Sequence, residues 1–322
     1  MITIAGAGVA GLACAYELSK RGLPVTVYEL GSSPADNPCS WFAGGLLAPW
    51  CEGETAEPEV VRLGAGAIDW WQQITPVEQC GTLVVAPPRD HAEMTRFAKR
   101  TERHQLIGQE EIATKEPALA GRFNQALFFA DEAHLDARQA LVDLSQKVQE
   151  LGAMVLYDTP APDHVDVDCR GIASTLPNLR PVRGEMAIIE APVVSIDRTV
   201  RLLHPRIPLY LVPRGNGIYM IGATMVESSS TRPITMRSML ELLGAAFTLH
   251  PALGEASVIE TGVGLRPAFA DNVPRLVRLG STIHVNGMYR HGFLLAPALA
   301  GQLAEQISQE QNHGNFSKRR TA

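Results

Sequence analysis

The chain has 322 residues, 46% of them hydrophobic and 19% charged, so it can bury a large core and is expected to form about two domains. A net charge of −6 argues against a nucleic-acid partner, and no stretch is long and apolar enough to span a membrane. The apolar start is interrupted by glycines and charges too early for a secretory signal peptide. Five cysteines without a CxxC pair indicate free thiols in a reducing cytoplasm.

The first 29 residues predict a strand, a glycine-rich turn, a helix and a second strand that ends in an acid. Gly6 makes the tight turn, Gly8 lets the backbone approach a pyrophosphate, and Gly11 lets the helix pack close to the strand. The N-terminus of the helix offers free N–H groups to the phosphates. Glu29 stands where a carboxylate can accept both hydroxyls of an adenosine ribose. We therefore expect the chain to bind a dinucleotide through its ADP half.

Hydrophobic periodicity and turn residues predict the remaining elements in chain order. After a glycine-broken loop at 31–53 we expect a helix at 58–74, a strand at 80–86, a helix at 90–103, a polar connection, a strand at 126–130, a helix from the N-cap Asp136 to Gly152, strands at 154–157, 165–169, 185–190, 209–213 and 218–225, a helix at 235–248, strands at 257–265 and 282–286, and a helix at 294–309.

This order predicts an α/β protein with antiparallel strands inserted twice into a nucleotide-binding domain. We expect a discontinuous Rossmann-like domain of residues 1–78, 131–178 and 257–310. A mostly antiparallel β substrate domain would consist of residues 79–130 and 179–256, and residues 311–322 would form a flexible tail.

The fingerprint alone does not distinguish NAD from FAD, because both contain ADP. A nicotinamide dehydrogenase continues through regular βαβ units, whereas the acid here is followed by a long apolar, glycine-rich loop, and there is no second fingerprint. The stretch 285–295 predicts a strand, a glycine loop and a helix start. A helix N-terminus placed there would stabilise a reduced isoalloxazine ring. These features favour FAD.

Several motifs, each weak alone, occur here in a specific order over nearly the whole chain. They are the N-terminal fingerprint, Ala43-Gly-Gly-Leu-Leu-Ala48, Asp168-Cys-Arg-Gly171, Val182-Arg-Gly-Glu-Met186, Tyr210-Leu-Val-Pro-Arg214, Ile221-Gly-Ala-Thr-Met225, Gly264-Leu-Arg-Pro267 and Gly287 to Gly292. In these the chain resembles the FAD-dependent D-amino-acid oxidase superfamily, and within it the glycine oxidases of thiamin biosynthesis.

The resemblance implies a set of residues that contact the cofactor. They are Gly6, Gly8, Val9, Ala10 and Gly11 at the pyrophosphate, Glu29 at the ribose, Ala43, Gly44, Gly45 and Leu46 beside the isoalloxazine, Arg170 and Gly171 against the dinucleotide, and Arg290, His291, Gly292, Phe293, Leu294 and Leu295 at the pyrimidine edge. His291 is also explained as a polar loop residue that offers only its backbone N–H. Covalently flavinylated relatives use a cysteine near the C-terminal loop. Because no cysteine follows Cys169, we expect noncovalent FAD, and no metal.

Amino-acid oxidation requires a small substrate held by its carboxylate, with its C–H bond directed at the flavin, and needs no side-chain base. The resemblance assigns the carboxylate to Arg266, since a guanidinium is a planar, bidentate, permanently charged donor. It adds Tyr210 as a hydroxyl donor, Met225 as a pocket wall and Arg290 near flavin and substrate. The alternatives are a surface arginine at a strand end, a tyrosine filling a sheet face and a core methionine. Leu46 replaces a methionine of some glycine oxidases, which leaves the pocket width open.

The implied activity is oxidation of glycine, with sarcosine or small D-amino acids as further candidates, to the imine and 2-oxo acid, with reduction of O2 to H2O2. The imine would serve thiazole synthesis for thiamin. One alternative is a D-amino-acid dehydrogenase that passes electrons to a quinone or a protein partner. Another is a flavin-binding protein without turnover. The sequence leaves the substrate range, the electron acceptor and homo-oligomerisation open.

Overall fold

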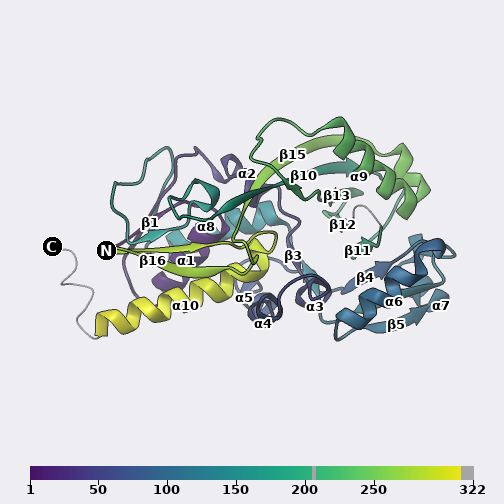
Figure 1. Ribbon diagram of the computed structural model, residues 1–322, viewed down its shortest axis with the longest axis horizontal. Coiled ribbons are helices and arrows are strands. Elements are labelled where there is room, and N and C mark those ends of the chain that lie inside the picture. Colours follow the sequence, from purple (N-terminus) through teal and green to yellow (C-terminus); the bar gives the residue numbers. More distant parts are fainter. Residues whose placement is uncertain (205–207, 313–322) are drawn as a thin grey trace.

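The computed structural model describes residues 1–204 and 208–312. Figure 1 shows two parts side by side: a smaller sheet with helices α1 (Val9–Lys20) and α10 (Gly292–Asn312), and a larger sheet with helices α6 (His91–Arg100) and α9 (Met236–Leu249). Residues 313–322, most of the expected tail, lie outside the described part, and α10 continues to the last described residue.

Six strands of the described chain form the smaller sheet. In spatial order they are β16 (Arg275–Leu279), β17 (Thr282–Asn286), β9 (Val167–Asp168), β1 (Ile2–Ala5), β2 (Val25–Tyr28) and β8 (Met154–Leu156). The central strand β1 pairs in parallel with β2 and β9. Helices α1, α10 and α8 (Ala137–Glu150) pack together over a core rich in leucine and alanine. The carboxyl ends of the parallel strands thus share one edge, where α/β sheets bind ligands.

The larger sheet contains nine strands within the described ranges. In order they are β14 (Val226–Glu227), β10 (Arg180–Glu190), β13 (Ile218–Gly222), β12 (Leu209–Pro213), β11 (Thr199–Leu202), β4 (Thr82–Val85), β6 (Gln125–Phe129) and β5 (Gln105–Gly108), with β15 (Ser257–Ala268) paired to β10. Its pairings are antiparallel except for β11 with β4. Helix α9 buries Leu242, Ala246 and Leu249 against one face, and α6 buries Met94 and Phe97 near β6.

Short elements connect the two sheets. They are α2 (Pro38–Trp41), β3 (Leu46–Leu47), α3 (Pro49–Glu52), α4 (Pro58–Gly64), α5 (Ala67–Trp71) and β7 (Ala133–His134), whereas α7 (Gln109–Lys115) lies between β5 and β6 of the larger sheet. The loop expected at 31–53 therefore contains a short 3-10 helix at Pro34–Asp36, the one-turn helices α2 and α3, and strand β3, which pairs with β7.

Local signals predicted most of these elements correctly. The opening strand, helix and strand are confirmed as β1, α1 and β2, and β17 coincides with the predicted strand at 282–286. The Asp136 carboxylate caps α8 by accepting hydrogen bonds from the backbone N–H of Arg138 at 2.8 Å and of Gln139 at 3.2 Å. The substrate strands at 185–190 and 209–213 are confirmed within β10 and β12.

Several predicted elements were wrong in extent or missing. The single helix at 58–74 is two helices, because α4 ends at Gly64, where a Cβ would lie 2.7 Å from Cγ of Leu294 on α10. The polar connection before residue 126 contains β5 and α7, and strands β11 and β16 were not predicted. The strand expected at 218–225 ends at Gly222. In each case tertiary packing outweighed a weak local pattern.

Strand β15 changes the position of Arg266. It extends to Ala268, so Arg266 lies inside a paired strand, opposite Val182, rather than at a strand end. Residues 257–268 were assigned to the nucleotide-binding domain, yet β15 pairs along its length with β10 of the larger sheet. The remaining domain boundaries stay a prediction.

Candidate functional site

A cavity of about 790 Å³ runs from the carboxyl ends of the smaller sheet to strands β10, β13 and β15 of the larger one. Thirteen of the residues singled out from the sequence line it: Gly6, Gly8, Val9, Ala10, Glu29, Ala43, Gly44, Arg170, Gly171, Arg266, Arg290, Gly292 and Phe293. Residues more than 280 positions apart in the chain therefore share one wall of the cavity. Phe42, Met186 and Met220 give the end near the larger sheet an apolar surface.

The turn after β1 is shaped to receive a pyrophosphate. Gly6 has φ +98°, and a Cβ on it would lie 2.9 Å from the carbonyl oxygen of Cys169. A Cβ on Gly11 would lie 1.8 Å from the carbonyl oxygen of Gly6, so only glycine permits this approach of α1 to the turn. Helix α1 begins at the cavity, where Gly8 has no side chain to cap it, although the first N–H of the helix, that of Val9, donates to the Ser40 hydroxyl at 3.2 Å and so is not free as predicted. The turn thus leaves the close backbone access that a dinucleotide needs.

Glu29, at the end of β2, completes the ADP half of the cavity. Its Oε2 accepts hydrogen bonds from the Ala7 backbone N–H at 2.7 Å and from Nδ2 of Asn37 at 2.9 Å, and its Oε1 accepts one from the Gly31 N–H at 3.1 Å. These bonds fix the carboxylate at the cavity edge, where it remains able to accept ribose hydroxyls. The glycine cradle, this carboxylate and the apolar far end together fit FAD.

Other predicted cofactor residues support the cavity without lining it. Gly45 has φ +70°, and a Cβ there would lie 2.2 Å from the Leu135 carbonyl oxygen, while Leu46 packs against the cluster that contains Met186 and Met220. Leu294 and Leu295 are buried beneath the start of α10. Gly11 belongs to this group as well. We attribute a structural role to these five residues, and their contact with FAD stays a prediction.

Arg266 is a half-buried cation at the far end of the cavity. Its Nη1 donates to the Thr224 carbonyl oxygen at 2.9 Å, and within the described chain no carboxylate lies at ion-pair distance from it. Burial lowers its pKa, although a guanidinium stays charged. Its guanidinium carbon lies 2.3 Å from where a Cβ on Gly184 would stand, so glycine on β10 makes room for it. An uncompensated guanidinium facing a cavity is a natural carboxylate-binding group.

A second layer of buried polar groups positions the carbonyl that Arg266 contacts. The Thr224 hydroxyl donates to Oε2 of Glu185 at 2.9 Å and accepts from the Glu185 backbone N–H at 3.0 Å. Glu185 in turn forms an ion pair of 2.7 Å with Arg183, and both side chains are almost fully buried. The segment Val182 to Met186, noted from the sequence only as a shared motif, therefore holds the support of Arg266.

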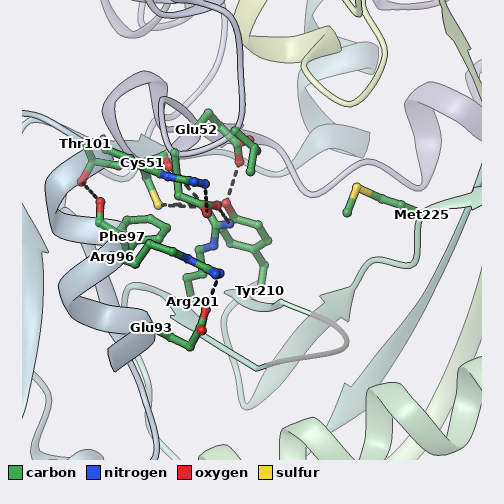
Figure 2. A network of polar contacts seen from close by, with 12 residues as sticks. Cys51, Glu52, Glu93, Arg96, Phe97, Thr101, Arg201, Tyr210 and Met225 are labelled. Atoms are coloured by element: carbon green, nitrogen blue, oxygen red, sulfur yellow. Dashed lines mark hydrogen bonds and ion pairs between the residues drawn. The ribbon is translucent and has the colours of Figure 1, made fainter. Parts of the chain in front are cut away.

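Tyr210 faces a carboxylate that the sequence analysis missed. Its hydroxyl donates to Oε1 of Glu52, at the end of α3, at 2.6 Å (Figure 2). The Tyr210 ring packs against Met186 and Met220, which line the cavity, although Tyr210 itself is not part of the lining. Its guanidinium neighbour Arg201 lies 5.1 Å from the ring centre. Burial raises the pKa of Tyr210, so the phenol keeps its proton.

Glu52 connects Tyr210 with the C-terminal loop. Its Oε2 accepts a hydrogen bond from Nη2 of Arg290, and Nδ1 of His291 lies 3.7 Å away. Burial alone would raise the pKa of Glu52, but the neighbouring cations, Arg290 first, outweigh it and lower the pKa to about 2. Burial lowers the pKa of His291 to about 4, so its ring is neutral at pH 7. Glu52 escaped sequence analysis because its partners lie 158 and 238 positions away.

Met225 is separated from the Tyr210 group, as Figure 2 shows. Its side chain is 45% exposed, and its sulfur accepts from the Tyr289 hydroxyl and from Nη1 of Arg290, both at 3.4 Å. It lines a second, smaller cavity of about 210 Å³ instead of the large one. Tyr289 and Arg290 line both cavities, so Met225 stands at their junction.

The described residues lack a membrane-spanning helix and a cluster of metal-binding side chains. None of their helices is long and apolar enough to cross a bilayer. They also contain no group of three or more histidine, cysteine or acidic side chains that could hold a metal ion.

Comparisons with known proteins agree with this geometry. The family described as FAD dependent oxidoreductase, DAO, matches residues 1–306. A Rhizobium etli protein that bears the name thiamine biosynthesis oxidoreductase ThiO is 51% identical over 96% of this chain and 97% of its own length. The glycine oxidase of Pseudomonas aeruginosa is 25% identical over 95% of this chain and 94% of its own.

Among solved structures, the crystal structure of glycine oxidase from Geobacillus kaustophilus superposes with a TM-score of 0.81 at 22% identity. The match covers 96% of this chain and 94% of that one. At this identity the likeness establishes the fold alone. It confirms the predicted combination of a Rossmann-like domain with a mostly antiparallel substrate domain.

Proposed function

The chain belongs to the family of FAD-dependent oxidoreductases, and we propose that it oxidises glycine, sarcosine or a small D-amino acid to the imine, with O2 as electron acceptor. Hydrolysis of the imine gives the 2-oxo acid and ammonia, or methylamine from sarcosine, and O2 leaves as H2O2. The observation that carries the proposal is Arg266, a half-buried guanidinium without a carboxylate partner in the described chain, at the apolar end of the FAD cavity.

Bound FAD supplies the acceptor for the hydride that leaves the α-carbon. Gly6, Gly8 and Gly11 provide backbone access to its pyrophosphate, and Glu29 accepts from its ribose. The start of α10, at Gly292 and Phe293, lies at the same cavity, where its unpaired N–H groups stabilise negative charge. The family and the cavity lining support these assignments.

The chain itself contributes orientation and the exclusion of water. Arg266 binds the substrate carboxylate with the guanidinium edge that the Thr224 carbonyl does not engage. Phe42, Met186 and Met220 form an apolar wall that keeps water from the α-carbon. No side chain has to remove a proton from carbon, since the hydrogen leaves with its electron pair. Because no carboxylate of the described residues lies at ion-pair distance from Arg266, this end of the cavity offers an ammonium group no direct partner there and favours the neutral amine.

The roles of Tyr210, Arg290 and Met225 are less direct than the resemblance implied. The Tyr210 hydroxyl and the Arg290 guanidinium already contact Glu52, and Met225 lies at the smaller cavity. We infer that Arg266 is the main carboxylate-binding group and that Arg290 forms part of the wall beside it, with Tyr210 joined to Arg290 through Glu52.

We propose that the imine or 2-oxo product supplies thiazole synthesis for thiamin. The 51% identity with the Rhizobium etli protein supports this assignment, because that protein is named for thiamine biosynthesis. A strain that lacks the gene should then require thiazole when amino-acid oxidation is its only source of the imine. Growth without thiazole would contradict this part of the proposal.

An anaerobic spectral titration of the purified yellow protein tests the activity. Glycine, sarcosine, D-alanine and D-proline are added in turn, and flavin absorbance is followed. We expect at least one to bleach the flavin and air to restore it with one H2O2 per turnover. A flavin that none of them reduces would overturn the proposal, and reoxidation by dyes but not by air would replace O2 with another acceptor.

The noncovalent state of FAD has a separate test. Cys39 and Cys169 line the cavity, and no cysteine follows Cys169, where covalently flavinylated relatives attach the cofactor. Acid precipitation of the protein should leave all the yellow colour in the supernatant. Flavin retained on the denatured chain would show a covalent bond.

A further inference from the structure

The arginines around the large cavity differ in how their charge is compensated. Of the described residues, Arg170, Arg266 and Arg290 line it. Arg170 forms an ion pair of 2.6 Å with Asp168, and Arg290 pairs with Glu52. Arg266 alone of these three has no carboxylate partner in the described chain. A carboxylate that enters the cavity therefore meets one uncompensated guanidinium.

Glu52 accounts for this difference. The residue is 5% exposed, and its two carboxylate oxygens accept hydrogen bonds from the Tyr210 hydroxyl and from Arg290. A phenol has a single proton to donate, so while it serves Glu52 the Tyr210 hydroxyl offers only lone pairs to other groups. Arg290 also donates to the Thr55 hydroxyl at 2.8 Å. Arg290, the other guanidinium at this end of the cavity, is thus engaged by Glu52, and the Tyr210 hydroxyl behind the lining is engaged as well.

The adjoining smaller cavity is no more favourable to an anion. Its acidic and basic lining consists of Glu54, Glu57, Asp271, Arg201, Arg290 and His291, and it also contains the phenol of Tyr289. Arg201 forms an ion pair of 3.1 Å with Glu54, and Arg290 is held by Glu52. The acids of this lining outnumber its guanidinium groups, and burial keeps the His291 ring neutral by lowering its pKa to about 4.

We propose that Glu52 determines substrate specificity: by occupying Tyr210 and Arg290 it limits the site to amino acids with one carboxylate. An amino acid that carries a second acid on its α-carbon or its nitrogen would place that acid against Arg290, where Glu52 repels it. Excluding unwanted ligands by charge is a common route to selectivity. The inference rests on the proposed function, because it takes Arg266 as the group that binds the single carboxylate.

Titration of the FAD-loaded protein with three non-substrate ligands tests it. Acetate has one carboxylate, malonate has two, and malonamate is the near-isosteric monoamide of malonate. Binding is followed by perturbation of the flavin spectrum at about pH 8, where both malonate carboxyls are ionised. We expect malonate to bind the wild-type protein at least about tenfold more weakly than malonamate.

The variant Glu52→Gln removes the charge and keeps the size of the side chain. It should tighten malonate binding about tenfold or more, while the Kd values of acetate and malonamate change less than about threefold. Glu59→Gln is the matched control, since Glu59 is a surface acid paired with Arg62 and 42% exposed. It should leave all three Kd values unchanged.

The double variant Glu52→Gln/Arg290→Gln identifies the group that receives the second acid. Without Arg290 the tighter binding of malonate should disappear, and the ratio of the Kd of malonate to the Kd of malonamate should return to its wild-type value. A gain that persists in the double variant overturns the inference. An equal shift in the Kd values of acetate, malonate and malonamate in Glu52→Gln also overturns the inference, because that result is expected if Glu52 has only a structural role.

The wild-type measurement stands even if the variants lose FAD. Equal binding of malonate and malonamate by the wild-type protein would overturn the inference without any substitution. Failure of the proposed function is a different result, namely flavin that no amino acid reduces. The ligand titrations use oxidised flavin, so they remain readable in that case.

Discussion

At the scale of single residues, the proposed site depends on one half-buried charge and on the space made for it. Arg266 is held by the Thr224 carbonyl at 2.9 Å and lies directly over Gly184. A guanidinium withdrawn from bulk water normally has a carboxylate partner, because desolvating an unpaired charge is costly. Its absence among the described residues supports the proposal that Arg266 binds the carboxylate of the substrate.

Substitution of Arg266 tests that interpretation directly. Arg266→Gln should raise KM for the best substrate about 100-fold, since a charge-assisted bidentate contact is worth about 3 kcal/mol. FAD binding should persist, because the ADP half of the cavity lies at the other end. Steady-state kinetics and the flavin spectrum measure both quantities, with Arg62→Gln as the surface control. An unchanged KM would show that another group binds the carboxylate.

Gly184 offers a smaller perturbation of the same contact. In Gly184→Ala the new methyl group would lie 2.3 Å from the Arg266 guanidinium carbon, which must shift. We expect KM to rise more than about tenfold while FAD affinity stays the same. Gly244→Ala in α9, where a Cβ meets open space, is the control. Equal kinetics in both alanine variants would argue against a precisely placed Arg266.

At the scale of elements, the contact between β1 and α1 shapes the nucleotide end. The three glycines of the turn were predicted to have separate roles, and the structure shows a distinct steric reason for Gly6 and for Gly11. A Cβ on Gly11 would meet a backbone carbonyl oxygen, which cannot rotate away as a side chain can. Close packing of helix on turn therefore depends on the absence of one methyl group.

Gly11→Ala should for this reason lose FAD. Its Cβ would lie 1.8 Å from the Gly6 carbonyl oxygen, so the turn must open, at a cost of about 1–3 kcal/mol in stability. Purified variant protein should be colourless and should melt at a lower temperature than wild type. Gly301→Ala in α10, with no atom within 4 Å of the new Cβ, should keep both flavin and Tm. A yellow Gly11→Ala protein of normal stability would contradict the steric account.

At the scale of the whole molecule, buried ionisable groups between the two parts link stability to pH. Glu132 accepts a hydrogen bond from the Cys51 N–H at 2.6 Å and so ties β7 to α3. Burial raises its pKa from 4.5 to about 8. The folded protein therefore holds a proton that the unfolded chain releases, and stability falls as pH rises from 4.5 through 8. Two histidines act oppositely: burial lowers the pKa values of His134 and His291 to about 4.

Glu132 and the two histidines affect stability in different pH ranges. The histidines reduce stability as pH falls from 6.5 towards 4, whereas above 6.5 only Glu132 of these three groups contributes. Between pH 6.5 and 8 the wild-type protein should lose about 2 kcal/mol of stability through Glu132. Glu132→Gln should remove this slope, as thermal unfolding at several pH values would show. A slope that survives in the variant would assign it to other groups.

Much of the nucleotide end was predictable from short-range patterns. The β1–α1–β2 unit, the cap at Asp136 and the acid at Glu29 each depend on residues within about 30 positions, where backbone geometry limits the possibilities. The large cavity collects most of the residues named on this basis. The order of motifs along the chain likewise indicated the family, because each motif consists of adjacent residues.

The sequence alone thus determined the cofactor class and the fold class, since glycine spacing and hydrophobic periodicity act locally. Tertiary structure decided which charges meet. Glu52 reaches Tyr210 across 158 positions and Arg290 across 238, and Thr224 supports Arg266 across 42. Burial then sets the ionisation of these groups, because desolvation depends on everything packed around a side chain and not on its neighbours along the chain.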